Sequence, residues 1–203
     1  MTRKELSQVD WQDLRDQERA PTVMNQRFFE DQLGEDAGGR DVSRLGWAFA
    51  QGPLPVDVRP GQQLYRWEDP RRNLDRMPRE FYSPHPQPFV HVFGGDFDEE
   101  APTGWVHREF QVQQTCQGYA GFAKNLPGKP DGRQIFAPGL QVTSPGEPFM
   151  RSVGPAWNRE DMENRVIPAF LTKHSEFEWT GQWSTPPEEW GRNSKAEFRR
   201  RQK

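Results

Sequence analysis

The stretch Trp105-Val-His-Arg-Glu-Phe-Gln-Val112 alternates apolar and polar side chains. Three apolar residues share one face and three polar residues share the other: Val106, Phe110 and Val112 against His107, Glu109 and Gln111. Alternation over this length is typical of a strand with one buried face. The sequence therefore predicts β structure in this part of the chain.

Prolines are dense in residues 46–104, which precede this strand. They are Pro53, Pro55, Pro60, Pro70, Pro78, Pro84, Pro86, Pro88 and Pro102. Because each proline removes a backbone donor and they interrupt every run of more than about ten residues, helices are nearly excluded here. Short strands are predicted at Leu64–Trp67 and Phe89–Phe93, and Ser83–Pro88 is expected to favour polyproline II.

Helical spacing of apolar residues marks the start of the chain. Ser7 is the predicted cap of a first helix that ends at Pro21. A second helix is predicted from Val23 to Leu33, with Gly34 as its stop.

Weaker signals follow residue 118, where Gly and Pro again break the chain. Short apolar runs occur at 135–136 and 140–142. Asn158 predicts the cap of a helix that runs through Met162 to Val166 and is limited by Pro168. A strand is predicted at 176–183, and Ser194 with Glu197 forms a capping box that starts a short basic helix.

These elements predict an irregular α+β fold, with short strands and a few short helices joined by long Pro/Gly-rich extended segments. The expected organisation is a helical N-terminal arm at 1–45, a loop-rich region with short strands at 46–190 and a basic C-terminal helix at 191–203.

Composition bears on whether such a chain folds alone. Only 33% of the 203 residues are hydrophobic, against roughly 45–50% in globular domains, and 18 Gly and 19 Pro are present. Eight Trp and 14 Phe nonetheless argue against disorder, because disordered segments are depleted in aromatic residues. The combination favours order borrowed from a partner, and a self-sufficient globular domain stays open as the alternative.

Several function classes are disfavoured by the same inventory. A net charge of -3 argues against nucleic acid as a partner. The single Cys116 excludes a disulfide and a Cys-based zinc site, and the four histidines lack metal-motif spacing, so no cofactor or metal is expected. No segment approaches the length of a membrane span, so we expect no membrane partner and a cytoplasmic location.

Three short segments resemble arginine-directed ADP-ribosyltransferases. They are Leu64-Tyr65-Arg66, Val142-Thr143-Ser144 and Glu176-Phe177-Glu178. The resemblance implies that Arg66 holds a dinucleotide phosphate and that Glu178 stabilises an oxocarbenium-like transition state. An ADP-ribosyltransferase-like enzyme using Arg66 and Glu176/Glu178 is therefore one alternative.

The segment Gly118-Tyr119-Ala120-Gly121-Phe122 is similar to a G-Y-x-G-F motif of ciliary microtubule inner proteins. These are slender Pro- and aromatic-rich chains that line the microtubule doublet. The resemblance implies a structural scaffold subunit of a large assembly, with tubulin or other structural subunits as partners and the cilium axoneme as location. A virion structural component is the other structural alternative, and the leading hypothesis is not an enzyme.

Under this hypothesis aromatic side chains and the basic tail bind the partner. The candidate partner-binding residues are Trp67, Trp105, Tyr119, Phe122, Trp157, Trp179, Trp183, Trp190, Arg199, Arg200 and Arg201. Aromatic residues and arginine are the types that dominate binding energy at protein interfaces. No catalytic residue is predicted.

Overall fold

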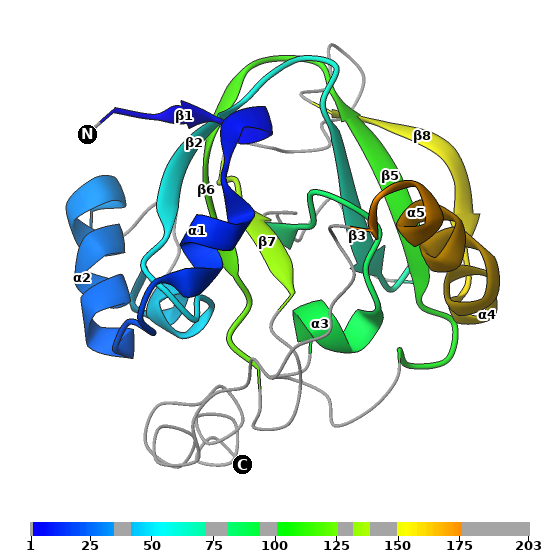
Figure 1. Cartoon of the computed structure of the whole chain (residues 1–203), viewed down its shortest axis with the longest axis horizontal. Helices are drawn as coiled ribbons and strands as arrows, with labels where there is room; N and C mark the ends of the chain where they lie inside the picture. The colour runs from blue at the N-terminus through cyan, green and yellow to red at the C-terminus, as the bar shows by residue number, and fades with distance from the viewer. Residues whose placement is uncertain are drawn as a thin grey trace.

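A computed structural model describes residues 2–34, 42–71, 81–93, 101–125, 132–138 and 150–175. It has two β-sheets with short helices around them, which confirms the predicted α+β class (Figure 1). The five-stranded sheet has the order β1 (Lys4–Glu5), β2 (Leu54–Val58), β6 (Cys116–Phe122), β7 (Arg133–Phe136) and β4 (Phe81–Tyr82). The three-stranded sheet has the order β3 (Gln63–Glu68), β5 (Val106–Val112) and β8 (Met150–Trp157).

Strand β5 is the alternating stretch identified in the sequence, and it lies at the centre of the smaller sheet. Phe110 and Val112 are buried, as the alternation predicts. β5 pairs antiparallel with β3 and with β8, with a shift of register between His107 and Glu109 on the β8 side. The predicted strand at Leu64–Trp67 is also confirmed, within β3, and the short apolar run at 135–136 lies in the strand β7.

The chain supplies its own core. A first cluster fills the space between the two sheets and includes Leu64, Phe110, Phe122, Ile135 and Met150, each fully buried. Since these residues come from both sheets, burial of apolar area holds the sheets together. The described residues thus bury a core of their own, and whether the chain also takes order from a partner stays a prediction.

An aromatic cluster lies under α2 (Thr22–Leu33). Phe29 is fully buried there and touches the rings of Phe28, Phe49, Tyr119 and Phe136, with centroid distances of 5.2 to 5.7 Å. Most of these rings meet edge to face, the arrangement that aromatic quadrupoles prefer. Rings thus replace the aliphatic side chains that the sequence lacks.

Two predicted boundaries near the start of the chain need correction. The first helix, α1 (Trp11–Asp16), is capped by Asp10 and not by Ser7, because the Asp10 carboxylate accepts from the amides of Gln12 and Asp13. The residues around Ser7 form a 3-10 turn, η1 (Leu6–Gln8). The second predicted helix is confirmed as α2, and Gly34 at φ +80° ends it.

The prediction of a strand at Phe89–Phe93 is wrong, because this segment forms the helix α3 (Phe89–Phe93). The amide of His91 donates to the carbonyl of Pro88 at 3.1 Å, so the helical turn starts at the proline. Proline favours the first turn of a helix, where its missing N–H costs nothing. The proline density therefore did not exclude helices from this region, and a second helical segment, η2 (Val42–Trp47), enters it at residues 46–47.

Pro168 does not limit the last described helix. The chain continues from α4 (Arg159–Asp161) through a π-helical turn, η3 (Met162–Val166), into α5 (Ile167–Lys173). The π-turn ends just before Pro168, so the helix passes a residue that cannot donate a backbone bond. The predicted cap is confirmed, since the Asn158 side chain accepts from the Asp161 amide at 2.8 Å.

The expectation that glycines break the chain from residue 118 is wrong for residues 118–122, which belong to the buried strand β6 (Cys116–Phe122). Gly118 and Gly121 make room for neighbours: a Cβ at Gly121 would lie 2.5 Å from the Phe49 ring. The short run predicted at 140–142, the strand at 176–183 and the basic helix at 191–203 lie outside the described residues. Within the described part of the chain no helix has the length and apolar character needed to cross a membrane.

Candidate functional site

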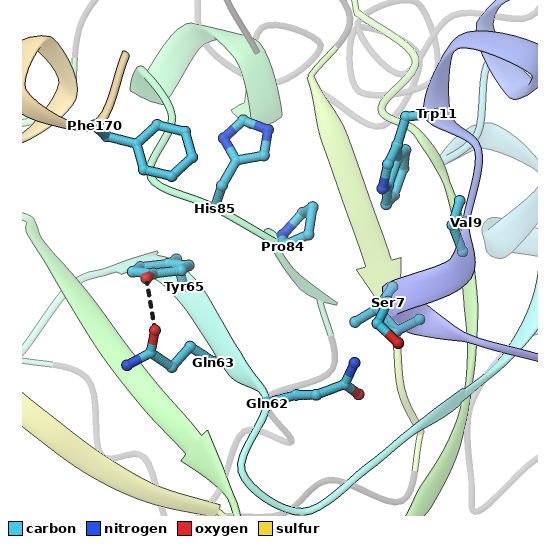
Figure 2. Close-up of a pocket in the computed structure, with 10 residues that line it drawn as sticks. Ser7, Val9, Trp11, Gln62, Gln63, Tyr65, Pro84, His85 and Phe170 are labelled. Atoms are coloured by element: carbon cyan, nitrogen blue, oxygen red, sulfur yellow. Dashed lines mark hydrogen bonds between the residues drawn. The ribbon is translucent and has the colours of Figure 1, made fainter. Parts of the chain in front are cut away.

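A cavity of about 430 Å³ lies between the smaller sheet and residues 6–11 (Figure 2). Four separate stretches line it: Leu6, Ser7, Val9 and Trp11; Gln62, Gln63 and Tyr65; Pro84 and His85; and Phe170. The volume lies within the range of small-molecule sites, about 300–1,000 Å³. Among the described residues this cavity is the candidate functional site.

A backbone bridge between the two sheets holds one wall of the cavity. The amide of Tyr65 donates to the Ser83 carbonyl at 2.8 Å, and the amide of Ser83 donates to the Tyr65 carbonyl at 2.7 Å. This bridge connects β3 to the residue after β4. It therefore fixes the start of the Pro84–His85 wall relative to Tyr65.

Gln87 fixes the other end of that wall. Its side-chain amide donates to the Arg133 carbonyl at 2.7 Å and accepts from the Arg133 amide at 2.9 Å. Its own carbonyl accepts from the Trp67 indole at 2.9 Å. The Pro-rich segment expected to be extended is thus bonded to β7 and to β3, so that both sheets hold His85 in place.

His85 is a neutral ring in this wall. Its Nδ1 lies 2.9 Å from the Pro86 carbonyl oxygen, and because a carbonyl only accepts, Nδ1 carries the proton. Burial, more than the nearby charges, lowers the pKa of His85 to about 3. The ring stacks on Phe170 at 5.3 Å with an interplanar angle of 4°, which attaches α5 to the cavity.

Tyr65 is a neutral hydrogen-bonding group at the cavity floor. Burial and, second, the charge of Glu109 raise the pKa of its phenol to about 12. The hydroxyl donates to the Gln63 side-chain oxygen over 3.5 Å, a long and weak bond (Figure 2). Behind it the ring stacks on buried His107 at 5.8 Å. Tyr65 thus offers the cavity a ring face and a protonated hydroxyl.

Residues 6–11 form the opposite wall of the cavity. Trp11 meets Phe122 edge to face at 5.8 Å, and the Arg133 guanidinium lies 5.2 Å from the Trp11 ring centroid. Leu6 and Val9 are buried in the core between the sheets. This wall is apolar except for Ser7.

The ten lining residues include no Asp, Glu, Lys or Arg. Their polar groups are the Ser7 hydroxyl, two glutamine amides, the Tyr65 phenol and the His85 ring. Within the described residues no cluster of His, Cys, Asp and Glu is arranged to hold a metal ion. The site can offer ring faces and uncharged hydrogen bonds.

Three of the predicted partner-binding residues are buried inside the chain. Trp67, Tyr119 and Phe122 are at most 3% exposed. Trp67 packs against Phe89 and His107, and Tyr119 belongs to the cluster under α2. Their apolar surface is already covered by this chain, so it is not available to a partner.

Trp105 and Trp157 are half-buried in a third cluster, beside Trp67 and under η3 and α5. Trp105 meets Phe89 and Phe93 edge to face. The remaining predicted residues lie outside the described part of the chain: Trp179, Trp183, Trp190, Arg199, Arg200 and Arg201. Their role in partner binding stays a prediction.

The alternative of an ADP-ribosyltransferase-like enzyme gains no support. Arg66 is a β3 residue whose guanidinium donates to the Phe81 carbonyl at 3.2 Å and lies over the Tyr82 ring. It thus joins β3 to β4 within the fold. Residues 142–144 and 176–178 lie outside the described residues.

Sequence reasoning missed most of the cavity. Tyr65 and His85 were noted for other reasons, as part of a strand and of a Pro-rich run. The signal that was available is the run Ser83–Pro88, because a polar ring between prolines in a short, rigid segment is easily held at a cavity wall. Ser7, Gln62 and Phe170 carry no local pattern that marks them.

No protein-family model matches the sequence, and no curated protein matches it. Three solved structures show a partial likeness in shape. Tse6 in complex with Tsi6 is 11% identical with a TM-score of 0.44, and the match covers 67% of this chain and 99% of that chain. Tne2 in complex with Tni2 is 15% identical with a TM-score of 0.37, over 51% and 89% of the two chains. Rhs1-CT in complex with its cognate immunity protein RhsI1 is 12% identical with a TM-score of 0.36, over 54% and 83%.

The fold corrects the leading hypothesis. None of the three structures is a ciliary microtubule inner protein or a virion component. The segment 118–122 that carried the ciliary resemblance is buried in β6, between β2 and β7. The assignments to a ciliary scaffold, to the cytoskeleton and to a virion are therefore wrong. Each of the three structures is a complex with a partner protein. A protein partner of this chain stays a prediction.

Proposed function

We propose that this protein binds a small, uncharged molecule with a planar ring in the cavity between the smaller sheet and residues 6–11. The observation that carries the proposal is the lining: four of the ten residues present rings, Trp11, Tyr65, His85 and Phe170, and none is charged. Aromatic walls with a few placed polar groups are the usual make-up of small-molecule sites.

The absence of charge on the lining residues favours an uncharged ligand. A charged group that enters the cavity loses part of its hydration, and none of the lining residues carries an opposite charge that would offset that cost. A neutral planar ring instead stacks on the aromatic faces and exchanges hydrogen bonds with the amides, the phenol and the serine hydroxyl.

The pKa values of His85 and Tyr65 favour a site that binds a ligand without catalysing a reaction. A proton-transfer catalyst works best with a pKa near the operating pH. The pKa of His85 is lowered to about 3 and that of Tyr65 is raised to about 12, so at neutral pH neither group exchanges protons readily. That the chain is not an enzyme and that it is cytoplasmic both stay predictions.

Three matched probes test the proposal: naphthol, naphthoate and decalol. Naphthol is planar and uncharged at neutral pH, naphthoate has the same rings with a negative charge, and decalol is uncharged but saturated. We expect saturable binding of naphthol, measured by calorimetry or ligand-observed NMR, and binding of the other two that is at least about tenfold weaker, or about 1.4 kcal/mol.

A pair of variants on one helix locates the site. Phe170→Ala removes a wall of the cavity and the stack on His85, so naphthol affinity should fall by about tenfold. Lys173→Ala changes an exposed residue outside the lining and should leave the affinity unchanged. Equal binding of naphthol and naphthoate would contradict the selectivity for an uncharged ligand. Equal naphthol affinities of the two variants would show that the cavity is not the binding site.

A further inference from the structure

One wall of the cavity belongs to a segment that is joined to the sheet by very little backbone pairing. Residues 2–9 contribute Leu6, Ser7 and Val9 to the lining. Their strand β1 has two residues, paired parallel to the outer side of β2 as Lys4 with Val56 and Glu5 with Asp57. Parallel pairing is slightly weaker per residue than antiparallel pairing, so side-chain contacts must hold this segment down.

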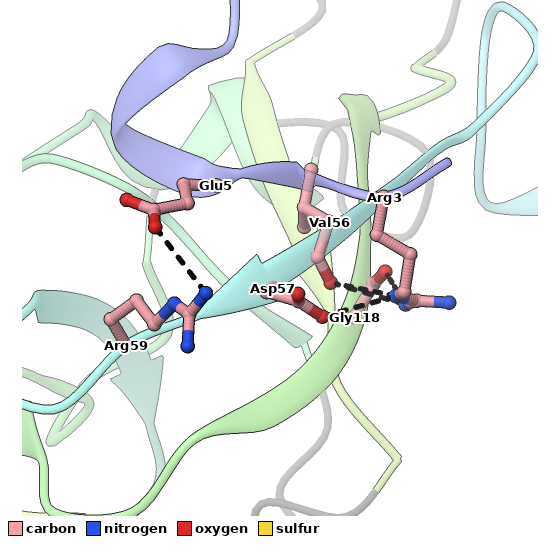
Figure 3. Close-up of polar contacts among 6 residues, drawn as sticks. All are labelled: Arg3, Glu5, Val56, Asp57, Arg59 and Gly118. Carbon is pink, nitrogen blue, oxygen red and sulfur yellow. Dashed lines mark hydrogen bonds and ion pairs between the residues drawn. The ribbon is translucent and has the colours of Figure 1, made fainter.

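Arg3 supplies the polar part of those contacts (Figure 3), and the buried Leu6 and Val9 supply the apolar part. Its Nη2 donates to the Gly118 carbonyl at 2.6 Å and to the Val56 carbonyl at 3.1 Å, and its Nε lies 3.3 Å from both the Val56 carbonyl and the Asp57 carboxylate. The guanidinium also lies 5.2 Å from the Tyr119 ring centroid. The Arg3 side chain therefore bonds to β2 and to β6 together.

Because the Arg3 side chain is mostly buried, its hydrogen bonds contribute more to holding the segment than exposed ones would. Its side chain is 17% exposed, and hydrogen bonds from a charged donor in a partly buried place are stronger than neutral ones. The other ion pair of the segment joins Glu5 to Arg59 at 3.3 Å, with side chains 42% and 48% exposed. An exposed pair of this kind contributes little.

The far end of the segment is held differently. Trp11 and Leu14 belong to α1 and pack against the core, and the bonds of Arg3 go to β2 and β6 and not to α1. Residues 2–9 therefore run from a polar anchor at Arg3 to an apolar anchor at Trp11. Loss of the polar anchor leaves residues 2–9 held by the β1 pairing and by Leu6 and Val9, while the sheets and α1 keep their own contacts.

We propose that residues 2–9 form a strap that closes the cavity, and that Arg3 is the latch of this strap. Local opening of a segment without global unfolding is a general property of folded proteins, and weakly paired edges open first. The effect of the strap on ligand exchange rests on the binding function proposed above, whereas opening of the strap does not.

Hydrogen exchange tests the latch in the full chain without a ligand. In Arg3→Ala, amides of residues 4–9 should exchange at least about tenfold faster than in the wild type, while amides of β6 keep their protection. Arg59→Ala, the matched control, breaks only the exposed pair and should leave both segments unchanged. Arg3→Lys keeps the charge but loses the fork of donors, so it should lie between the two.

Stopped-flow measurements with naphthol test the consequence for the cavity. Arg3→Ala should raise the association and dissociation rates by a similar factor, and Arg59→Ala should change neither. Unchanged exchange at residues 4–9 in Arg3→Ala, or faster exchange in the strap and β6 alike, overturns the strap. Faster strap exchange with unchanged naphthol rates overturns its role as a gate. If naphthol does not bind the wild type, the binding function fails while the exchange data still decide on the strap.

Discussion

Acidification should destabilise this protein through two buried histidines, His85 and His107. They are 7% and 1% exposed, and burial is the main cause that lowers the pKa of each to about 3 from an ordinary value of 6.5. The unfolded chain therefore binds protons at a pH where the folded chain does not. Stability is fully present above the unfolded pKa of 6.5 and is lost as the pH falls from there toward the folded value of about 3.

The size of the effect follows from the width of that window. Each pH unit corresponds to about 1.4 kcal/mol for each proton taken up on unfolding, so a fall to about pH 5 costs roughly 2 kcal/mol for each histidine and about 4 kcal/mol for both. His91, whose pKa burial lowers to about 4, acts in the same direction. Glu109 opposes it, because burial raises the pKa of its carboxyl. A loss of this size is a large part of the roughly 5–15 kcal/mol of an ordinary domain.

Urea titrations at a series of pH values between about 7 and 5 measure the loss as a change in the free energy of unfolding. The variant His107→Phe isolates one site, since a phenyl ring keeps the packing between Tyr65 and Trp67 and cannot take up a proton. We expect the pH dependence of this variant to be shallower by one proton. A free energy of unfolding that is level across the range, or an unchanged slope in the variant, would refute the reasoning.

Other predictions concern packing, capping and reactivity. Gly121→Ala should cost about 1–3 kcal/mol in urea unfolding because its Cβ would lie 2.5 Å from the Phe49 ring, whereas Gly52→Ala, with open space around it, should cost little. Asp10→Ala should cost about 1 kcal/mol by removing the cap of α1, and Asp10→Asn should keep most of it. Burial raises the pKa of the Cys116 thiol to about 12, so a thiol reagent at neutral pH should label the native protein slowly and the urea-unfolded protein fast. Rapid native labelling, or a Gly121→Ala variant as stable as Gly52→Ala, contradicts the packing described here.

The sequence predicted correctly those strands and helices that a local pattern of apolar and polar residues marks. The alternation of 105–112 marks β5, and the apolar spacing of 23–33 marks α2. A short apolar run such as residues 89–93 fits a strand or a helix equally well. Here it forms the helix α3, whose first turn starts at Pro88. β6 was missed because Gly118 and Gly121 break a strand on average, while here the Phe136 carbonyl and the Phe49 ring occupy the space they leave.

The candidate site was beyond sequence reasoning for a different reason. Its lining comes from four stretches, 6–11, 62–65, 84–85 and 170, that meet only through tertiary contacts. The contacts that bring them together include backbone bonds, such as the bridge between Tyr65 and Ser83, and side-chain contacts between residues far apart in the sequence, such as the stack of His85 on Phe170. Neither kind leaves a trace in the local residue pattern. No periodicity therefore marks the cavity as a whole, and the run Ser83–Pro88 indicates one of its walls.

The aromatic cluster under α2 has a consequence for the spectroscopy of this protein. Circulating π electrons shift the resonance frequency of nearby protons, and Phe29 lies within 6 Å of four other rings, Phe28, Phe49, Tyr119 and Phe136. Because most of these rings are held edge to face, the ring protons of one point into the magnetic field of the next. The proton spectrum of the folded chain should therefore be widely dispersed although aliphatic residues are few. A tilt of any one of these rings would then be seen as moved signals from its neighbours.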